Sequence, residues 1–252
     1  MNKWWLLLLA FPVLAADLQR EARWANEIVD AILVGEPEWL QSGDHRFLSI
    51  YTKPVGEVRH GAVILVHGSG VHPDWPEVIN PLRERLPEHG WATLSLQMPV
   101  LEAQARSEDY FPLFPEALAR IAAGSRFLRE QGYGTVVIIG HSLGSQMAAA
   151  WFAQARENAL QGFVAIGMTG RKRNGYGSTL DDLAVITVPT LDLYGEHDLD
   201  SVIASSTARL AAAQRARSDG YTQVEVKGAD HMFQGADGAL LDTVLQWLGD
   251  LK

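Results

Sequence analysis

The chain has 252 residues, of which 47% are hydrophobic and 20% are charged, and its formal net charge is −9 at pH 7. This composition is typical of a globular protein long enough for one large core, and the lack of a concentrated basic face excludes nucleic acid as a partner. Because the chain has no cysteine, disulfides and acylation on cysteine are excluded as well.

The first residues have the layout of a secretory signal. Lys3 supplies a positive charge, residues 4–13 form an almost unbroken apolar run, and residues 13–15 have the small-residue spacing that a signal peptidase reads. A membrane anchor is disfavoured because roughly 20 apolar residues are needed to span a bilayer, and a buried N-terminal helix is the other alternative. We therefore expect residues 1–16 to be a signal peptide and residues 17–252 to be a single domain secreted to the bacterial periplasm, with no stable membrane span after signal removal.

Helices and strands alternate along the rest of the chain. Apolar residues at helical spacing predict an N-terminal helix over residues 18–34, and an alternating pattern predicts an early, partly exposed strand over residues 46–51. Short apolar runs predict further strands over residues 62–66, 92–96, 135–139, 163–166, 190–194 and 222–226. Helical patterns separate them, over residues 81–89, 112–131, 142–156, 202–217 and 236–251. This order predicts an α/β fold with a mainly parallel central sheet, helices on both faces and no large lid domain.

One motif combines a serine with flanking glycines. Gly140-His141-Ser142-Leu143-Gly144 directly follows the strand expected at residues 135–139 and begins the next helix. On such a strand–turn–helix the serine occupies a tight turn, the glycines let the backbone pack closely, and the hydroxyl is exposed beside a helix N-terminus that favours an oxyanion. The competing interpretation is a glycine-rich helix cap. The position of the motif favours Ser142 as a nucleophile.

A serine hydroxyl needs a base, and two histidines follow Ser142 in the chain. His231 comes shortly after the last predicted strand, where a base would reach the sheet edge that carries the serine. His197 lies in the loop after the strand at residues 190–194. That loop should carry the acid that orients the base. We therefore expect His231 to be the base and Asp198 the acid, with Asp200 as the first alternative.

An oxyanion hole needs two backbone N–H groups. Leu143, directly after the serine, should supply one. The turn after the strand at residues 62–66 should supply the other, from Ser69 or, as a second choice, Gly70. A dinucleotide-binding loop is excluded here because Pro73 stands in place of its third glycine and Gln97 in place of its acidic residue. The sequence contains no phosphate-binding loop and no His-Glu-x-x-His motif, so we expect neither a cofactor nor a metal.

These residues resemble the motif set of the α/β-hydrolase superfamily. The resemblance rests on His67-Gly68, residues 140–144, Asp198 and His231, in the chain order serine, acid, histidine, and it covers about residues 45–250. It implies a serine hydrolase fold. The superfamily includes esterases, lipases, peptidases and thioesterases, so the fold alone does not select a substrate.

A narrower resemblance comes from three stretches outside the motif, at residues 72–76, 81–83 and 90–99. They resemble a bacterial family of α/β-hydrolase-like envelope proteins that is catalogued as a domain of unknown function. This resemblance implies the fold and the location and supplies no substrate.

Four residues are candidate substrate contacts because they leave strands at the edge expected to carry the serine. His72 and Trp75 would line the entrance, Tyr110 would wall an acyl pocket, and Arg171, in an Arg-Lys-Arg run, would hold an anionic group. Each has a structural alternative: an ordinary loop for His72 and Trp75, core packing for Tyr110, and a solvated loop for the basic run.

The sequence therefore predicts a serine hydrolase that acts through an acyl-enzyme on a carboxylic ester, either a small molecule or a lipid-like ester. Amidase, peptidase and thioesterase activities stay open within the enzyme class. The alternative from another class is a non-catalytic envelope protein that uses the same fold for binding.

Overall fold

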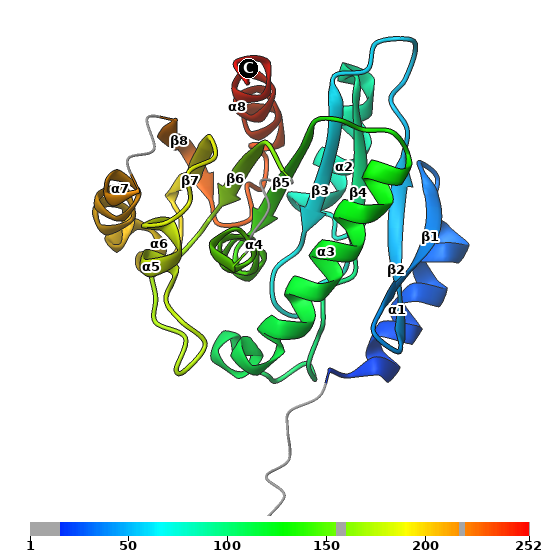
Figure 1. Cartoon of the computed structure of the whole chain (residues 1–252), viewed down its shortest axis with the longest axis horizontal. Helices are drawn as coiled ribbons and strands as arrows, with labels where there is room; N and C mark the ends of the chain where they lie inside the picture. Colours follow the sequence, from blue (N-terminus) through cyan, green and yellow to red (C-terminus); the bar gives the residue numbers. More distant parts are fainter. Residues whose placement is uncertain (1–15, 155–159, 217–219, 252) are drawn as a thin grey trace, which may run out of the picture.

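The computed structural model describes residues 16–154, 160–216 and 220–251, whose strands form one eight-stranded sheet (Figure 1). The order across the sheet is β1-β2-β4-β3-β5-β6-β7-β8. The first two pairings, β1 with β2 and β2 with β4, are antiparallel, and all others are parallel. The strands are β1 (Glu36–Ser42), β2 (His45–Thr52), β3 (Gly61–Val66), β4 (Trp91–Leu96), β5 (Val136–His141), β6 (Gly162–Ile166), β7 (Thr190–His197) and β8 (Tyr221–Asp230).

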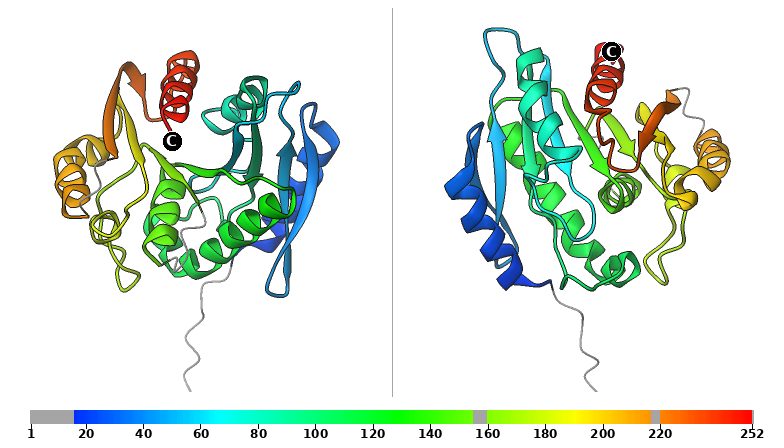
Figure 2. Two further views of the ribbon diagram at one scale, coloured as in Figure 1. Left: turned by 45° about the horizontal axis from the view of Figure 1, so that its top comes forward. Right: turned by 180° about the vertical axis from the view of Figure 1, so that it is seen from behind.

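Helices cover both faces of this sheet (Figure 2). One face packs against α1 (Leu18–Ala31), α2 (Ile79–Arg85) and α8 (Asp237–Gly249). The other packs against α3 (Phe114–Glu130), α4 (Leu143–Gln154), α5 (Thr179–Leu183) and α7 (Ser206–Arg215). A short α6 (Asp200–Ala204) and two 3-10 turns, Leu86–His89 and Ser107–Leu113, complete the elements. The predicted α/β fold is confirmed, and the described residues contain no large lid domain.

The central strands β3, β4, β5 and β6 are buried along their whole length. Their apolar side chains enter the cores on both faces, which explains why they are continuous apolar runs in the sequence. Such a sheet fixes the carboxyl ends of its parallel strands at one edge, and the loops at that edge are where an α/β fold places its functional residues.

Some elements differ from the sequence-based expectation. Strand β1 was not predicted, because it begins with Glu36, Pro37 and Glu38 and so gives no apolar run. The helix expected over residues 202–217 is two helices that divide at Ser205, whose hydroxyl donates to the Ser201 carbonyl and accepts from Gly170 N–H. The connector before β7 contains α5, which was also not expected.

Several predictions fall outside the described residues. They are the signal segment up to residue 15 and the ends of two expected helices at residues 156 and 217. Among the residues that are described, none of the helices is both long and apolar enough to cross a membrane.

Candidate active site

Ser142 occupies the sharp turn between β5 and α4 that the motif predicts. Its φ angle is +53°, a left-handed conformation that a side chain rarely adopts, and such strain is typical of functional turns. The flanking glycines make the turn possible: a Cβ at Gly140 would lie 2.7 Å from the Gly144 carbonyl oxygen, and one at Gly144 would collide with the Val66 carbonyl oxygen. The hydroxyl is thereby held at the carboxyl end of the sheet.

Three side chains from separate loops form one hydrogen-bonded line. His231 follows β8, and its Nε2 lies 3.0 Å from Ser142 Oγ. Its Nδ1 lies 2.6 Å from Oδ1 of Asp198, which follows β7. A carboxylate oxygen accepts, so Nδ1 carries the proton and Nε2 is free to accept the serine proton. The alternative acid, Asp200, instead begins α6.

Asp198 is held as a carboxylate. Burial alone would raise the pKa of this carboxyl, but hydrogen bonding and charge from His231 and two backbone N–H donors lower it below its usual value. The two donors are Leu199 N, at 2.8 Å from Oδ1, and Gly195 N, at 3.2 Å from Oδ2. An ionised Asp198 is suited to fix the tautomer of His231 and to stabilise its protonated form.

Gly167 is a neighbour of His231 that the sequence analysis missed. It follows β6 with φ +60°, and a Cβ there would lie 2.8 Å from Cε1 of His231. Only glycine leaves room for the imidazole at this point. A glycine directly after a predicted buried strand was the available sequence signal.

His141, inside the motif, also contacts His231. Its Nε2 lies 3.0 Å from the backbone carbonyl oxygen of His231, and the ring centroids are 5.0 Å apart. A carbonyl oxygen only accepts, so His141 donates through Nε2–H. Burial, assisted by the charge of His231, lowers the pKa of His141 to about 4. A neutral His141 therefore ties the His231 loop to the serine turn.

A second buried histidine, His67, holds the turn after β3. Its Nδ1–H donates to the Gly68 carbonyl oxygen at 2.8 Å, and its Nε2 accepts from Met98 N–H at 2.9 Å. Burial lowers the pKa of His67 to about 3. A Cβ at Gly68 would lie 3.7 Å from Ser142 Oγ, so the turn that continues into Ser69 packs on the serine.

The two predicted oxyanion donors are neighbours in the chain of residues that form or contact the serine turn. Leu143 is the first residue of α4, where backbone N–H groups lack an acceptor within the helix. Ser69 follows Gly68, and its Oγ lies 3.4 Å from Ser107 Oγ.

Helix α1 reaches the same turn through Arg20, which the sequence analysis did not single out. The Arg20 guanidinium donates to the Gly70 carbonyl oxygen at 3.2 Å and to the Leu101 carbonyl oxygen at 2.5 Å. It also stacks on Trp24, with its Cζ 4.3 Å from the ring centroid. No local sequence pattern predicts this contact, because 50 and 81 positions separate the partners in the chain.

His72 and Trp75 pack with α1. The His72 ring lies between Trp24 and Trp75, with a centroid distance of 5.3 Å to each, and all three side chains are partly buried. These contacts hold the loop that follows the turn at Gly68 and Ser69, and His72 and Trp75 stay candidate substrate contacts.

Tyr110 lies in the core, as its structural alternative predicted. Its side chain is buried and its hydroxyl accepts from Leu101 N–H at 3.1 Å. It therefore anchors the 3-10 turn to which it belongs in the core and presents no surface to a substrate.

The two arginines of the basic run, Arg171 and Arg173, lie in different environments. Arg171 is partly exposed, and its Nη1 lies 3.9 Å from Glu108 Oε1. Arg173 is buried, donates to Asp182 at 2.6 Å, and stacks on Phe114. The expectation of a solvated basic loop is wrong for Arg173, because a carboxylate and an aromatic ring stabilise its burial.

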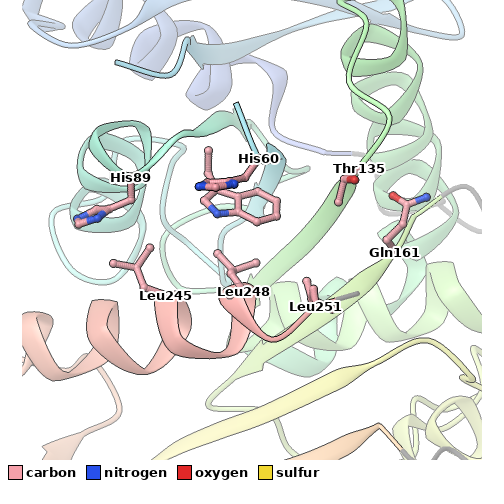
Figure 3. Close-up of a pocket in the computed structure, with 9 residues that line it drawn as sticks. His60, His89, Thr135, Gln161, Leu245, Leu248 and Leu251 are labelled. Atoms are coloured by element: carbon pink, nitrogen blue, oxygen red, sulfur yellow. The ribbon is translucent and has the colours of Figure 1, made fainter. Parts of the chain in front are cut away.

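In the described part of the chain, no group of three or more histidine or acidic side chains is arranged to hold a metal ion. A cavity of about 420 Å³ lies at the opposite, amino-terminal end of the strands (Figure 3). His60, Thr135 and Gln161, which precede β3, β5 and β6, line it together with leucines of α8. The cavity is therefore separate from the site around Ser142.

Solved structures of the same fold cover most of the chain. A dienelactone hydrolase from Anabaena variabilis has a TM-score of 0.70 and 22% identity, over 86% of this chain and 97% of that one. Est1E from Butyrivibrio proteoclasticus has a TM-score of 0.67 and 16% identity, over 86% and 100%. An alpha-beta serine hydrolase homologue from Coxiella burnetii has a TM-score of 0.66 and 16% identity, over 85% and 98%. At these identities the likeness establishes the α/β-hydrolase fold.

Sequence comparison identifies the family. No curated protein sequence matches the chain. The family DUF3530, described as proteins of unknown function, matches residues 12–116 and 114–249, which together include most of the chain. The chain therefore belongs to the DUF3530 family and has the α/β-hydrolase fold.

Proposed function

We propose that the chain is a serine hydrolase that cleaves carboxylic esters through an acyl-enzyme. The observation that carries the proposal is the hydrogen-bonded line from Ser142 Oγ through His231 to Asp198, on a strained turn next to a helix N-terminus. The three side chains come from loops after β5, β7 and β8. A serine activated by a neutral, oriented imidazole is the chemistry of acyl transfer.

In the proposed mechanism, Ser142 Oγ attacks the ester carbonyl carbon while His231 Nε2 takes the serine proton. The N–H groups of Leu143 and Ser69 stabilise the oxyanion of the tetrahedral intermediate. Its collapse breaks the bond to the leaving alcohol, which receives the proton from His231. Water then attacks the acyl-enzyme with His231 as base, which releases the acid and restores Ser142.

The proposed substrate is a small-molecule or lipid-like ester. The fold relatives include an esterase domain from Rhodothermus marinus and dienelactone hydrolases, which supports ester chemistry. Another relative is a puromycin-hydrolyzing peptidase from Mycobacterium tuberculosis, which keeps amide substrates open. We also propose a bacterial periplasmic location, on the basis of the signal pattern in residues 1–16.

The test is labelling with a fluorophosphonate, whose phosphorus reacts with an activated serine as fluoride leaves. We expect a single modification, mapped to Ser142, and no labelling in the folded Ser142→Ala variant. The same variant should lose ester turnover. A folded wild-type protein that stays unlabelled would contradict the proposal and favour a binding protein of this fold.

A further inference from the structure

Two loops that leave the sheet at the edge of Ser142 are joined by a pair of opposite charges. The 3-10 turn Ser107–Leu113 follows β4, and the connector that begins at Gly167 follows β6. Strands β3 and β5 lie between β4 and β6 in the sheet. The contact of Arg171 with Glu108 therefore spans the carboxyl ends of the two strands that lead to Ser69 and Ser142.

Short steps connect this charge pair with the reacting groups. On one side Glu108 follows Ser107, which contacts Ser69. On the other side Arg171 lies four positions after Gly167, which packs on His231. Both loops lie at the lower edge of the molecule in Figure 1. The charge pair therefore lies on the same edge of the sheet as the loops that carry Ser69 and His231.

The pair is weak, which leaves Arg171 able to exchange its partner. The charged atoms are 3.9 Å apart, and the side chains of Arg171 and Glu108 are 32% and 49% exposed. Such exposed pairs contribute little to stability, whereas a carboxylate that accepts two N–H bonds from one guanidinium is held much more strongly. Arg173 lacks this freedom because buried contacts to Asp182 and Phe114 occupy it.

We propose that Arg171 determines specificity by binding an anionic group of the substrate. The proposed hydrolase would then prefer esters that carry a carboxylate distant from the ester bond, and Glu108 would occupy Arg171 until that carboxylate replaces it. This inference rests on the proposed function. It names a substrate class that neither the fold nor the family description supplies.

The test compares two alkyl fluorophosphonates of matched length, one ending in a carboxylate and the other in a carboxamide, over a series of chain lengths. The readout is the ratio of their second-order labelling rates at Ser142. We expect wild type to favour the carboxylate reagent at one chain length. Arg171→Gln should slow that reagent about tenfold, equivalent to about 1.4 kcal/mol, and leave the carboxamide reagent unchanged.

Two further variants separate a specific contact from general attraction. Glu108→Gln removes the competing carboxylate and should raise the rate of the carboxylate reagent several-fold. Lys172→Gln removes an exposed charge next to Arg171 and should leave the ratio unchanged. The inference would be overturned if wild type and Arg171→Gln had the same ratio of labelling rates, or if Lys172→Gln changed the ratio as much as Arg171→Gln. In either case, labelling at Ser142 would still support the proposed function. A wild type that neither reagent labels would overturn both.

Discussion

At the scale of single residues, the imidazole of His231 packs against the backbone of a glycine, Gly167. Gly167 has φ +60°, and a Cβ there would lie 2.8 Å from the His231 ring. We expect Gly167→Ala to push the imidazole off its line to Ser142 and to lower kcat/KM for an ester at least tenfold. The measurement is steady-state kinetics on a protein shown to be folded by circular dichroism.

The matched control lies in the same connector. Gly175 also has a positive φ, +92°, but a Cβ there would meet nothing within 4 Å. Both substitutions introduce left-handed strain of about 1 kcal/mol, yet only Gly167→Ala places an atom against His231. Equal activity losses in the two variants would mean that backbone strain, and no contact with His231, is responsible.

His141 is expected to act on Ser142 only through His231. His141→Leu leaves the buried His231 carbonyl oxygen without this donor, which should cost about 1–3 kcal/mol of unfolding free energy. The labelling rate at Ser142 should fall with it, and His141→Gln, which keeps an N–H donor, should restore most of that rate. The readouts are urea denaturation and the rate of fluorophosphonate labelling.

Thr93→Val provides the comparison for His141. It removes another buried side-chain bond to a carbonyl, from Thr93 Oγ1 to Arg83 O at 2.8 Å, on a strand away from His231. We expect a similar loss of stability with an unchanged labelling rate. If Thr93→Val slowed labelling as much as His141→Leu, the effect of His141 would be one of general stability.

The positions of Ser142, Asp198 and His231 could be predicted because each residue follows a predicted strand. The parallel topology brings the carboxyl ends of these strands together at one edge of the sheet. Tyr110 and Arg173 follow the same rule of position and yet point into the core. The direction of a side chain in an irregular loop depends on partners such as Asp182, which local sequence does not identify.

At the scale of elements, α1 is expected to support the site without contacting a substrate. Arg20→Ala removes two hydrogen bonds to the loops after β3 and β4, together with the stacking on Trp24. We expect a loss of about 1–3 kcal/mol in unfolding free energy and a lower kcat, because the turn that holds Ser69 is released. Thermal denaturation and ester kinetics measure the two effects.

Arg23→Ala is the matched control on the same helix. Arg23 is exposed, so its removal changes the net charge equally but should alter the unfolding free energy by less than about 0.5 kcal/mol. If Arg20→Ala behaved like Arg23→Ala in both measurements, α1 would have no part in holding the site.

Helices and strands could be predicted where most of their residues are buried and therefore apolar. Strands β3 and β5 are apolar throughout, because both faces of the sheet are covered there. Strand β1 escaped prediction because it is a largely exposed edge strand in which only Leu40 is buried. The division of α6 from α7 depends on Ser205, whose hydroxyl bonds the distant Gly170. Such a tertiary contact leaves no periodic pattern in the sequence.

At the scale of the whole molecule, two buried neutral histidines should make stability depend on pH. The pKa values of His67 and His141 fall from an ordinary value near 6.5 to about 3 and about 4. Between the pKa of each histidine in the folded chain and its ordinary pKa near 6.5, the unfolded chain binds more protons than the folded one. The unfolding free energy is thus retained above pH 6.5 and should decrease as the pH falls below it, by about 1.4 kcal/mol per pH unit for each histidine.

This dependence is measurable by urea denaturation at several pH values from neutral to mildly acidic. In His141→Gln one of the two histidines is absent, so the slope of unfolding free energy against pH should be smaller by about 1.4 kcal/mol per pH unit. Identical slopes in wild type and variant would show that His141 binds a proton equally well in the folded and unfolded chain.

The place of β8 at the edge of the sheet determines when the site can exist at all. His231 follows this strand, 89 residues after Ser142, and β8 pairs within the sheet only with β7. In a chain whose last strand has not yet docked, the proposed base His231 would not lie beside Ser142. During refolding, we expect labelling at Ser142 to return only once β8 has paired with β7 and His231 lies beside Ser142. A time course of Ser142 labelling would then record the docking of β8, and a chain that ends before His231 should not be labelled.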